Sequence, residues 1–291
     1  MDLPRILLIG KRGQVAWELQ RTLAPMAQMT CWGSTELDLS AADTIRQRVR
    51  ETRPQVVVNA GGYTAVDKAE SEPDLALKIN GVAPGVLAEE CKRLDALLVH
   101  YSTDYIFDGA KREPYLESDL PNPLGVYGRS KLAGEQAIQA VGGAHLIFRL
   151  CWVYGARGQN FMLRMFRLAR EREKLHVVND QVGCPTWSRM IAEATTLALK
   201  QAIATRDFAA HTGTYHLAAS GQTSWHGFAR AIVGLMGGAE RKVKIIEEIT
   251  TAEYPTPACR PAYSVLNCEK LRRTFGLQLP HWEESLRQVC I

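Results

Sequence analysis

Residues 6–16 read Ile6-Leu7-Leu8-Ile9-Gly10-Lys11-Arg12-Gly13-Gln14-Val15-Ala16. The apolar residues 6–9 are typical of a strand buried on both faces, and a helical pattern runs from Gln14 to Leu23. A glycine-containing turn between such a strand and such a helix suits the pyrophosphate of a dinucleotide, because the helix N-terminus offers free N–H groups. The segment therefore predicts the first βα unit of a Rossmann-like fold.

The positions of this turn have separate expected tasks. Gly10 allows the tight turn, Gly13 lets the backbone approach the pyrophosphate, and the small Ala16 permits close packing of the helix on the sheet. The cofactor-binding residues predicted here are Gly10, Lys11, Arg12, Gly13, Gln14 and Val15.

The type of dinucleotide is indicated by the expected end of the second strand. Sites for NAD usually carry an acidic residue there for the ribose 2′-hydroxyl, but residues 29–34 contain no carboxylate. Lys11 and Arg12, with the Ser34 hydroxyl, suit a 2′-phosphate instead, so the sequence favours NADPH, with NADH as the alternative. The sequence leaves open a second interpretation, in which Lys11 and Arg12 are merely exposed loop cations.

The rest of the first half alternates short apolar runs with helical patterns. Strands are expected at 56–58, 97–99 and 146–148, and helices at 41–50, 74–93 and 130–140. After Cys151 the rhythm weakens, with helices expected at 161–173, 191–204 and 225–236 and strands at 176–178, 214–217 and 243–246. We predict an α/β fold with a doubly wound parallel sheet. Residues 1–151 would form the dinucleotide-binding domain and residues 152–291 mainly a smaller substrate-binding region, with some segments returning to the first domain.

Composition excludes several classes of function. The 291 residues carry a net charge of +4 without a dense run of Lys or Arg, so a nucleic-acid partner is not expected. No run of about 18 apolar residues predicts a membrane span, and the cytoplasm is the expected location. The seven cysteines include no C-x-x-C pair and the histidines no H-E-x-x-H, so no zinc site is predicted.

A tyrosine and a lysine at helical spacing carry the predicted chemistry. Tyr127 and Lys131 lie four residues apart and share one helix face. Reduction of a carbonyl by hydride builds charge on oxygen, which needs a nearby proton donor. A tyrosine can be that donor if a neighbouring ammonium lowers its pKa, which is the role expected for Lys131. Thr103 ends the fourth expected strand and would hydrogen-bond the carbonyl or the tyrosine oxygen. We therefore predict Tyr127, Lys131 and Thr103 as the catalytic residues of an NAD(P)H-dependent oxidoreductase.

Several motifs together resemble one family. They are residues 10–15, Asn59-Ala60-Gly61-Gly62-Tyr63-Thr64-Ala65-Val66-Asp67-Lys68-Ala69-Glu70, residues 102–105, 127–135 and 152–155, Asn179-Asp180-Gln181-Val182-Gly183-Cys184-Pro185-Thr186, and Arg260-Pro261. The chain resembles the extended short-chain dehydrogenases/reductases and, within them, is similar over its whole length to the dTDP-4-dehydrorhamnose reductases. The resemblance implies reduction of the C4 ketone of dTDP-4-dehydro-L-rhamnose, the last step of dTDP-L-rhamnose synthesis, which supplies bacterial surface polysaccharides.

The resemblance also implies roles for individual residues. Gly13, Gln14 and Val15 would line the pyrophosphate, Asp38 and Leu39 would flank the adenine, and Gly62, Tyr63 and Thr64 would line the cofactor near Tyr127 and Lys131. Thr103, Asp104 and Trp152 would hold the sugar, Arg260 the diphosphate, and Tyr127 would donate the proton.

Metal dependence and oligomeric state stay open at this stage. Some members of the family are metal-linked dimers, and no matching carboxylate set is recognised here. No metal ligand is assigned, a divalent ion such as Mg²⁺ is left open, and a monomer or a homodimer is expected.

Two alternatives share the scaffold. A nucleotide-sugar epimerase or 4,6-dehydratase is one, but a dehydratase would have an acidic pair after the threonine, and Asp104 is followed by Tyr105. The other is a non-catalytic NADP-binding regulatory subunit. The presence of Thr103, Tyr127 and Lys131 together argues against it.

Overall fold

The computed structural model describes residues 3–205 and 207–289. Its centre is a six-stranded sheet in the order β10-β5-β4-β3-β1-β2, in which every neighbouring pair is parallel. The strands are β1 (Arg5–Ile9), β2 (Gln28–Trp32), β3 (Val56–Asn59), β4 (Leu97–Thr103), β5 (His145–Leu150) and β10 (Gly213–His216). The predicted doubly wound parallel sheet is confirmed. The strand order reverses between β1 and β3, and the crevice at such a switch point is where ligands bind in this architecture.

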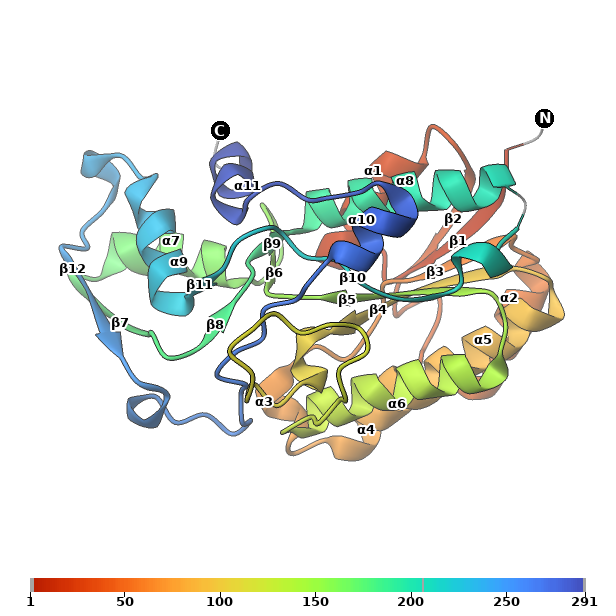
Figure 1. Cartoon of the computed structure of the whole chain (residues 1–291), viewed down its shortest axis with the longest axis horizontal. Helices are drawn as coiled ribbons and strands as arrows, with labels where there is room; N and C mark the ends of the chain where they lie inside the picture. Colours follow the sequence, from red (N-terminus) through yellow and green to blue (C-terminus); the bar gives the residue numbers. More distant parts are fainter. Residues whose placement is uncertain (1–2, 206, 290–291) are drawn as a thin grey trace.

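Helices cover both faces of the sheet, and this sandwich buries the apolar strands on both sides (Figure 1). One face carries α1 (Gln14–Leu23), α8 (Ser188–Thr205) and α10 (Glu269–Phe275). The other carries α2 (Ala42–Thr52), α5 (Ala83–Arg93) and α6 (Val126–Val141). Since β10, α8 and α10 come from the second half of the chain, that half contributes to the main sheet as well as to the smaller region.

The smaller region lies beyond the carboxyl ends of the strands and has its own core (Figure 1). It contains α7 (Phe161–Glu171), β7 (Lys174–Val178), β8 (Val182–Gly183), β11 (Thr223–Ser224), α9 (Trp225–Gly234), β12 (Ile245–Ile249) and α11 (Trp282–Val289). The pair β6 (Val153–Tyr154) and β9 (Thr186–Trp187) connects it to the main sheet. Within the described part of the chain, no helix is long and apolar enough to cross a membrane.

Two helices differ from the prediction in ways that affect the site. The helix expected at 74–93 is a composite of α4 (Pro73–Leu77), a π-helical turn (Lys78–Val82) and α5. The helix expected from residue 130 begins at Val126, so Tyr127 lies in its first turn. No side chain next to this helix caps it; the Val126 N–H instead donates to Glu70 Oε1 (2.8 Å), at the end of the short helix α3 (Val66–Ala69). A cap supplied from 56 residues away leaves no local sequence signal.

Candidate active site

Thr103 and Tyr127 meet at the carboxyl end of β4. Their side chains are hydrogen-bonded to each other. Thr103 Oγ1 also donates to Asp104 Oδ1 (3.1 Å) and accepts from the Tyr105 N–H (3.2 Å). Since a hydroxyl has one proton, Thr103 donates either to Asp104 or to Tyr127 at any moment. Thr103 therefore links the Tyr127 hydroxyl to the Asp104 carboxyl.

Asp104 is a buried carboxyl held by three donors. It is 2% exposed and accepts hydrogen bonds from Thr103, from Cys151 Sγ (3.1 Å) and from the side chain of Ser264. Burial raises the pKa of Asp104 to about 6, against the opposing effect of these hydrogen bonds. The Asp104 carboxyl, which holds Thr103 and through it Tyr127, therefore titrates near pH 6.

Lys131 is buried on the same face of α6, and its ammonium is held against β4. Its Nζ donates to the Tyr101 carbonyl (2.5 Å) and lies 3.5 Å from His100 Nε2. Burial lowers the pKa of Lys131 to about 8, and the nearby Glu135 carboxylate opposes that change. His100 is itself buried, with its Nδ1 at 3.1 Å from Asn59 Nδ2.

The expectation that Lys131 lowers the pKa of Tyr127 is not met in this structure. Burial raises the pKa of Tyr127 to about 12, and the Thr103 hydrogen bond counteracts this only in part. The physical reason is that the Lys131 amine is drawn to the Tyr101 carbonyl rather than to the phenol. Four-residue spacing placed both side chains on one helix face but did not determine where the amine points.

The glycine-containing turn lies at the switch point between β1 and β3. Gly10 has φ +90°, and a Cβ on it would come within 2.7 Å of the Ala60 backbone, so only glycine fits. Helix α1 follows directly after Gly13, and no side chain caps it. An uncapped helix N-terminus at the switch point fits the pyrophosphate of a dinucleotide. Val15 packs against the core, and Gln14 Oε1 accepts from Asn160 Nδ2 (2.8 Å).

A carboxylate does lie after β2, contrary to the expectation from residues 29–34. Glu36 forms an ion pair with Lys11 and accepts from the Gly33 N–H (2.9 Å). Lys11, with the Gly33 and Thr35 donors, lowers the pKa of Glu36 to about 2. The turn after β2 brings Glu36 back to the glycine turn. The expectation was based on residues 29–34 and therefore did not include Glu36. Arg12 is exposed beside this pair, and Ser34 is exposed as well.

The segment after β3 is held by an asparagine that the sequence analysis missed. Asn80, in the π-helical turn, accepts from the Tyr63 N–H (2.8 Å) and donates to the Tyr63 carbonyl (2.9 Å) and to Ser130 Oγ (3.0 Å). A Cβ on Gly62 would lie 3.9 Å from Lys131 Nζ, which places this segment beside the Lys131 side chain. The local sequence did not mark this residue, because its partners Tyr63 and Ser130 lie 17 and 50 residues away.

The remaining predicted cofactor residues lie in the segments that follow β2 and β3. Leu39 Cδ1 is the nearest atom, at 2.9 Å, to a Cβ built on Gly61. Asp38 is exposed and accepts from the Ser40 N–H (2.8 Å), so it orders the approach to α2. The Tyr63 hydroxyl donates to Glu72 Oε2 (2.7 Å), and Thr64 is exposed.

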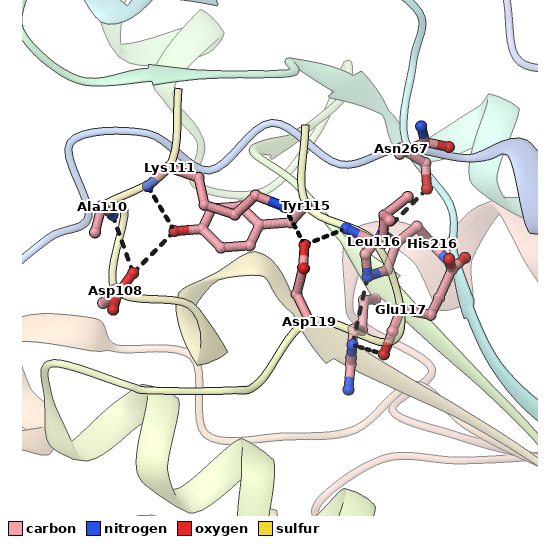
Figure 2. Close-up of polar contacts among 10 residues, drawn as sticks. Asp108, Ala110, Lys111, Tyr115, Leu116, Glu117, Asp119, His216 and Asn267 are labelled. Carbon is pink, nitrogen blue, oxygen red and sulfur yellow. Dashed lines mark hydrogen bonds and ion pairs between the residues drawn. The ribbon is translucent and has the colours of Figure 1, made fainter. Parts of the chain in front are cut away.

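The loop from residue 107 to residue 125 leads from Thr103 to Tyr127 and is tied down along its length. Figure 2 shows Tyr115 Oη donating to Asp108 Oδ1 (2.9 Å) and Lys111 paired with Asp119 (2.6 Å). Glu117 Oε1 accepts from the N–H of His216, in β10 (2.8 Å) (Figure 2). These contacts hold the loop against the sheet, so α6 and Tyr127 start from a defined place.

Arg260 is not free in this structure. It makes two hydrogen bonds with Asp67, Nη1 to Oδ1 (3.0 Å) and Nη2 to Oδ2 (2.9 Å), and it is also hydrogen-bonded to Tyr105. The paired guanidinium joins the C-terminal segment to the loop after β3. Among residues 3–205 and 207–289, no group of three or more His, Cys, Asp and Glu side chains is arranged to hold a metal ion.

Known proteins resemble the chain over its full length. Residues 4–290 match the family model described as the RmlD substrate binding domain. The dTDP-4-dehydrorhamnose reductase of Burkholderia thailandensis is 50% identical over 292 residues, which are 99% of this chain and 98% of that protein. That of Escherichia coli K12 is 44% identical, covering 98% of this chain and 96% of that protein. The crystal structure of the Bacillus anthracis dTDP-4-dehydrorhamnose reductase in complex with NADP has a TM-score of 0.90 and 35% identity, with 99% of each chain covered.

Proposed function

The chain belongs to the dTDP-4-dehydrorhamnose reductase family, and we propose that it reduces the C4 ketone of dTDP-4-dehydro-L-rhamnose to dTDP-L-rhamnose with NADPH. The observation that carries this proposal at the level of residues is the hydrogen-bonded chain from Asp104 through Thr103 to Tyr127, with Lys131 buried beside it. This arrangement fixes the Tyr127 hydroxyl at the carboxyl end of β4, the edge of the sheet at which ligands bind in this architecture.

In the proposed mechanism, bound NADPH supplies the hydride, and the residues of this chain manage the charge on oxygen. Tyr127 donates its proton to the C4 oxygen as negative charge develops there. Thr103, which is itself held by Asp104, orients the phenol before transfer. The Lys131 ammonium turns from the Tyr101 carbonyl towards the resulting tyrosinate and stabilises it.

Cofactor recognition is assigned to the glycine turn and the rim of the crevice. Gly10, Gly13 and the first N–H groups of α1 hold the pyrophosphate, and Gly62 and Tyr63 lie along the nicotinamide end. Arg12 is exposed and follows Lys11 in the glycine turn, and we assign the 2′-phosphate of NADPH to Arg12 and Lys11. Glu36 would hydrogen-bond the ribose hydroxyl of NADH, which keeps NADH as a second cofactor.

Substrate recognition is assigned to the residues between the sheet and the smaller region. Asp104 and Trp152 contact the sugar, and Arg260 contacts the diphosphate. Because Asp67 holds Arg260 in this structure, the diphosphate has to compete with that carboxylate for the guanidinium. We retain the division at residues 151 and 152, a cytoplasmic location, and a monomer or homodimer as further parts of the proposal.

The deciding experiment follows NADPH oxidation with dTDP-4-dehydro-L-rhamnose for the wild type and for Tyr127→Phe. We expect turnover by the wild type and a loss of about a thousandfold in kcat for Tyr127→Phe, since the proton donor is removed. Tyr215→Phe is the matched control, because its hydroxyl bonds the His211 carbonyl, away from the crevice. No turnover by the wild type would favour the non-catalytic NADP-binding subunit, whereas an active Tyr127→Phe would refute only the assigned donor.

A further inference from the structure

Trp152 has an unusual backbone conformation for so large a residue. Its φ is +43°, in the left-handed region that bulky residues rarely adopt. It lies between β5 and β6, and its neighbour Cys151 bonds Asp104. Such a conformation persists only where surrounding contacts enforce it, and it is concentrated at functional sites. The contacts that hold Trp152 are therefore informative.

A second tryptophan covers one face of the Trp152 ring. The indole of Trp225 stacks on it with ring centroids 3.5 Å apart and an angle of 5° between planes. Trp225 is fixed in turn by its Nε1–H, which donates to Gln181 Oε1 (3.2 Å), and by the ring of Phe161 at 4.6 Å. It is the first residue of α9, whose start is capped by the Ser224 hydroxyl accepting from the Gly227 N–H (2.9 Å). The smaller region therefore supplies and holds the ring that stacks on Trp152.

The segment from Gln181 to Thr186 supplies the other supports. A Cβ on Gly183 would lie 2.5 Å from Trp152 Cε2, so the backbone of Gly183 packs directly on the indole. The Thr186 N–H donates to the Trp152 carbonyl (3.2 Å), and Gln181 Nε2 donates to Thr251 Oγ1 (3.0 Å). This segment has no role in the proposed chemistry, yet three of its residues contact Trp152 or its stacking partner.

We propose that Trp225, with Gln181 and Gly183, is a positioning residue that holds Trp152 against the sugar of the dTDP-sugar and so helps the site select that sugar. The proposal rests on the proposed function in one respect, that Trp152 contacts the sugar. Trp225 acts through the Trp152 ring and has no part in proton transfer. Its loss should therefore weaken binding of the sugar and leave the nucleotide contacts and the chemical step in place.

The test measures the stack and the ligand separately. Two stacked indoles at this separation couple their electronic transitions, so the pair gives a perturbed band in the near-ultraviolet spectrum. Trp225→Leu should abolish that band, weaken binding of dTDP-L-rhamnose about tenfold, and change binding of dTDP by less than about twofold. In turnover, KM should rise while kcat stays within about twofold. Trp225→Phe keeps a stacking ring and should restore most of the affinity without the band, and it is the variant to use if Trp225→Leu fails to fold.

Trp282→Phe is the matched control, because Trp282 lies in the core of the smaller region against Phe228. It should keep the band and the affinities for both ligands. Equal weakening of dTDP and dTDP-L-rhamnose by Trp225→Leu, or loss of the band without any change in affinity, would overturn the proposal. Trp152→Ala tests the sugar contact separately from the proposed activity. If it leaves dTDP-L-rhamnose binding unchanged while the wild type turns over, the sugar contact is wrong and the activity stands.

Discussion

Replacement of Asn80 by alanine tests whether the segment after β3 is preformed for the cofactor. The side chain makes three hydrogen bonds, two to the Tyr63 backbone and one to Ser130. At about 1 kcal/mol net for each bond, Asn80→Ala should lower the free energy of unfolding by about 3 kcal/mol. Ser130→Ala removes one of these three bonds and its own bond to the Tyr127 carbonyl (2.8 Å), and should cost about 2 kcal/mol. It keeps both bonds from Asn80 to Tyr63, which makes it the matched control.

The same substitution should weaken NADPH binding. Without Asn80 the backbone around Tyr63 is ordered only when the cofactor binds. Ordering a residue costs about 1–2 kcal/mol, which corresponds to a rise of about tenfold in the Kd for NADPH. The assays are urea unfolding and fluorescence titration with NADPH, both on the full chain. An unfolding free energy within about 1 kcal/mol of wild type would refute the account of the hydrogen bonds. An unchanged Kd in a clearly destabilised variant would show that this segment does not contact the cofactor.

Three further outcomes are expected from charged side chains. Glu36→Gln frees Lys11 from its ion pair and should shift the ratio of kcat/KM for NADPH over NADH upward several-fold, as measured by steady-state kinetics with both cofactors. Burial raises the pKa of Asp104 from 3.8 to about 6, so ionisation of this carboxyl opposes folding. The resulting loss in unfolding free energy is absent below about pH 4, grows up to about pH 6, and then stays at about 3 kcal/mol. Asp104→Asn removes this ionisation, so the fall in unfolding free energy between about pH 4 and about pH 6 that this carboxyl contributes should be absent when the variant is unfolded in urea across pH. Glu135→Gln leaves the buried Arg149 guanidinium without its charge partner and should cost about 3–5 kcal/mol of unfolding free energy, whereas a cost below about 1 kcal/mol would mean that water reaches this pair.

Much of the fold followed from local patterns. The strand at residues 6–9, the glycine turn and the helix from Gln14 to Leu23 were predicted within a residue of their observed bounds. Local patterns suffice here because apolar runs and helical periodicity report burial directly. The start of α6 was missed because its cap is Glu70, and the π-helical turn at 78–82 was missed because its periodicity is close to that of the helices around it.

The residues of the candidate site also divide into those that local sequence patterns predicted and those that depend on distant partners. Tyr127, Lys131 and Thr103 could be selected because their residue types and spacing match the chemistry. Glu36 and Asn80 could not be selected, since their partners Lys11 and Tyr63 lie 25 and 17 residues away in the sequence. Their importance comes from contacts that exist only after the chain folds.

The sequence by itself determined the βα order, the glycine turn and the presence of one tyrosine, one lysine and one threonine suited to carbonyl reduction. It did so because these features depend on residue type and on short spacings along the chain. Only the tertiary structure decided that Lys131 turns to the Tyr101 carbonyl, that Asp67 holds Arg260, and that Trp152 is stacked on Trp225. Each of these depends on partners distant in sequence, whose competition for one side chain is settled by distance and burial.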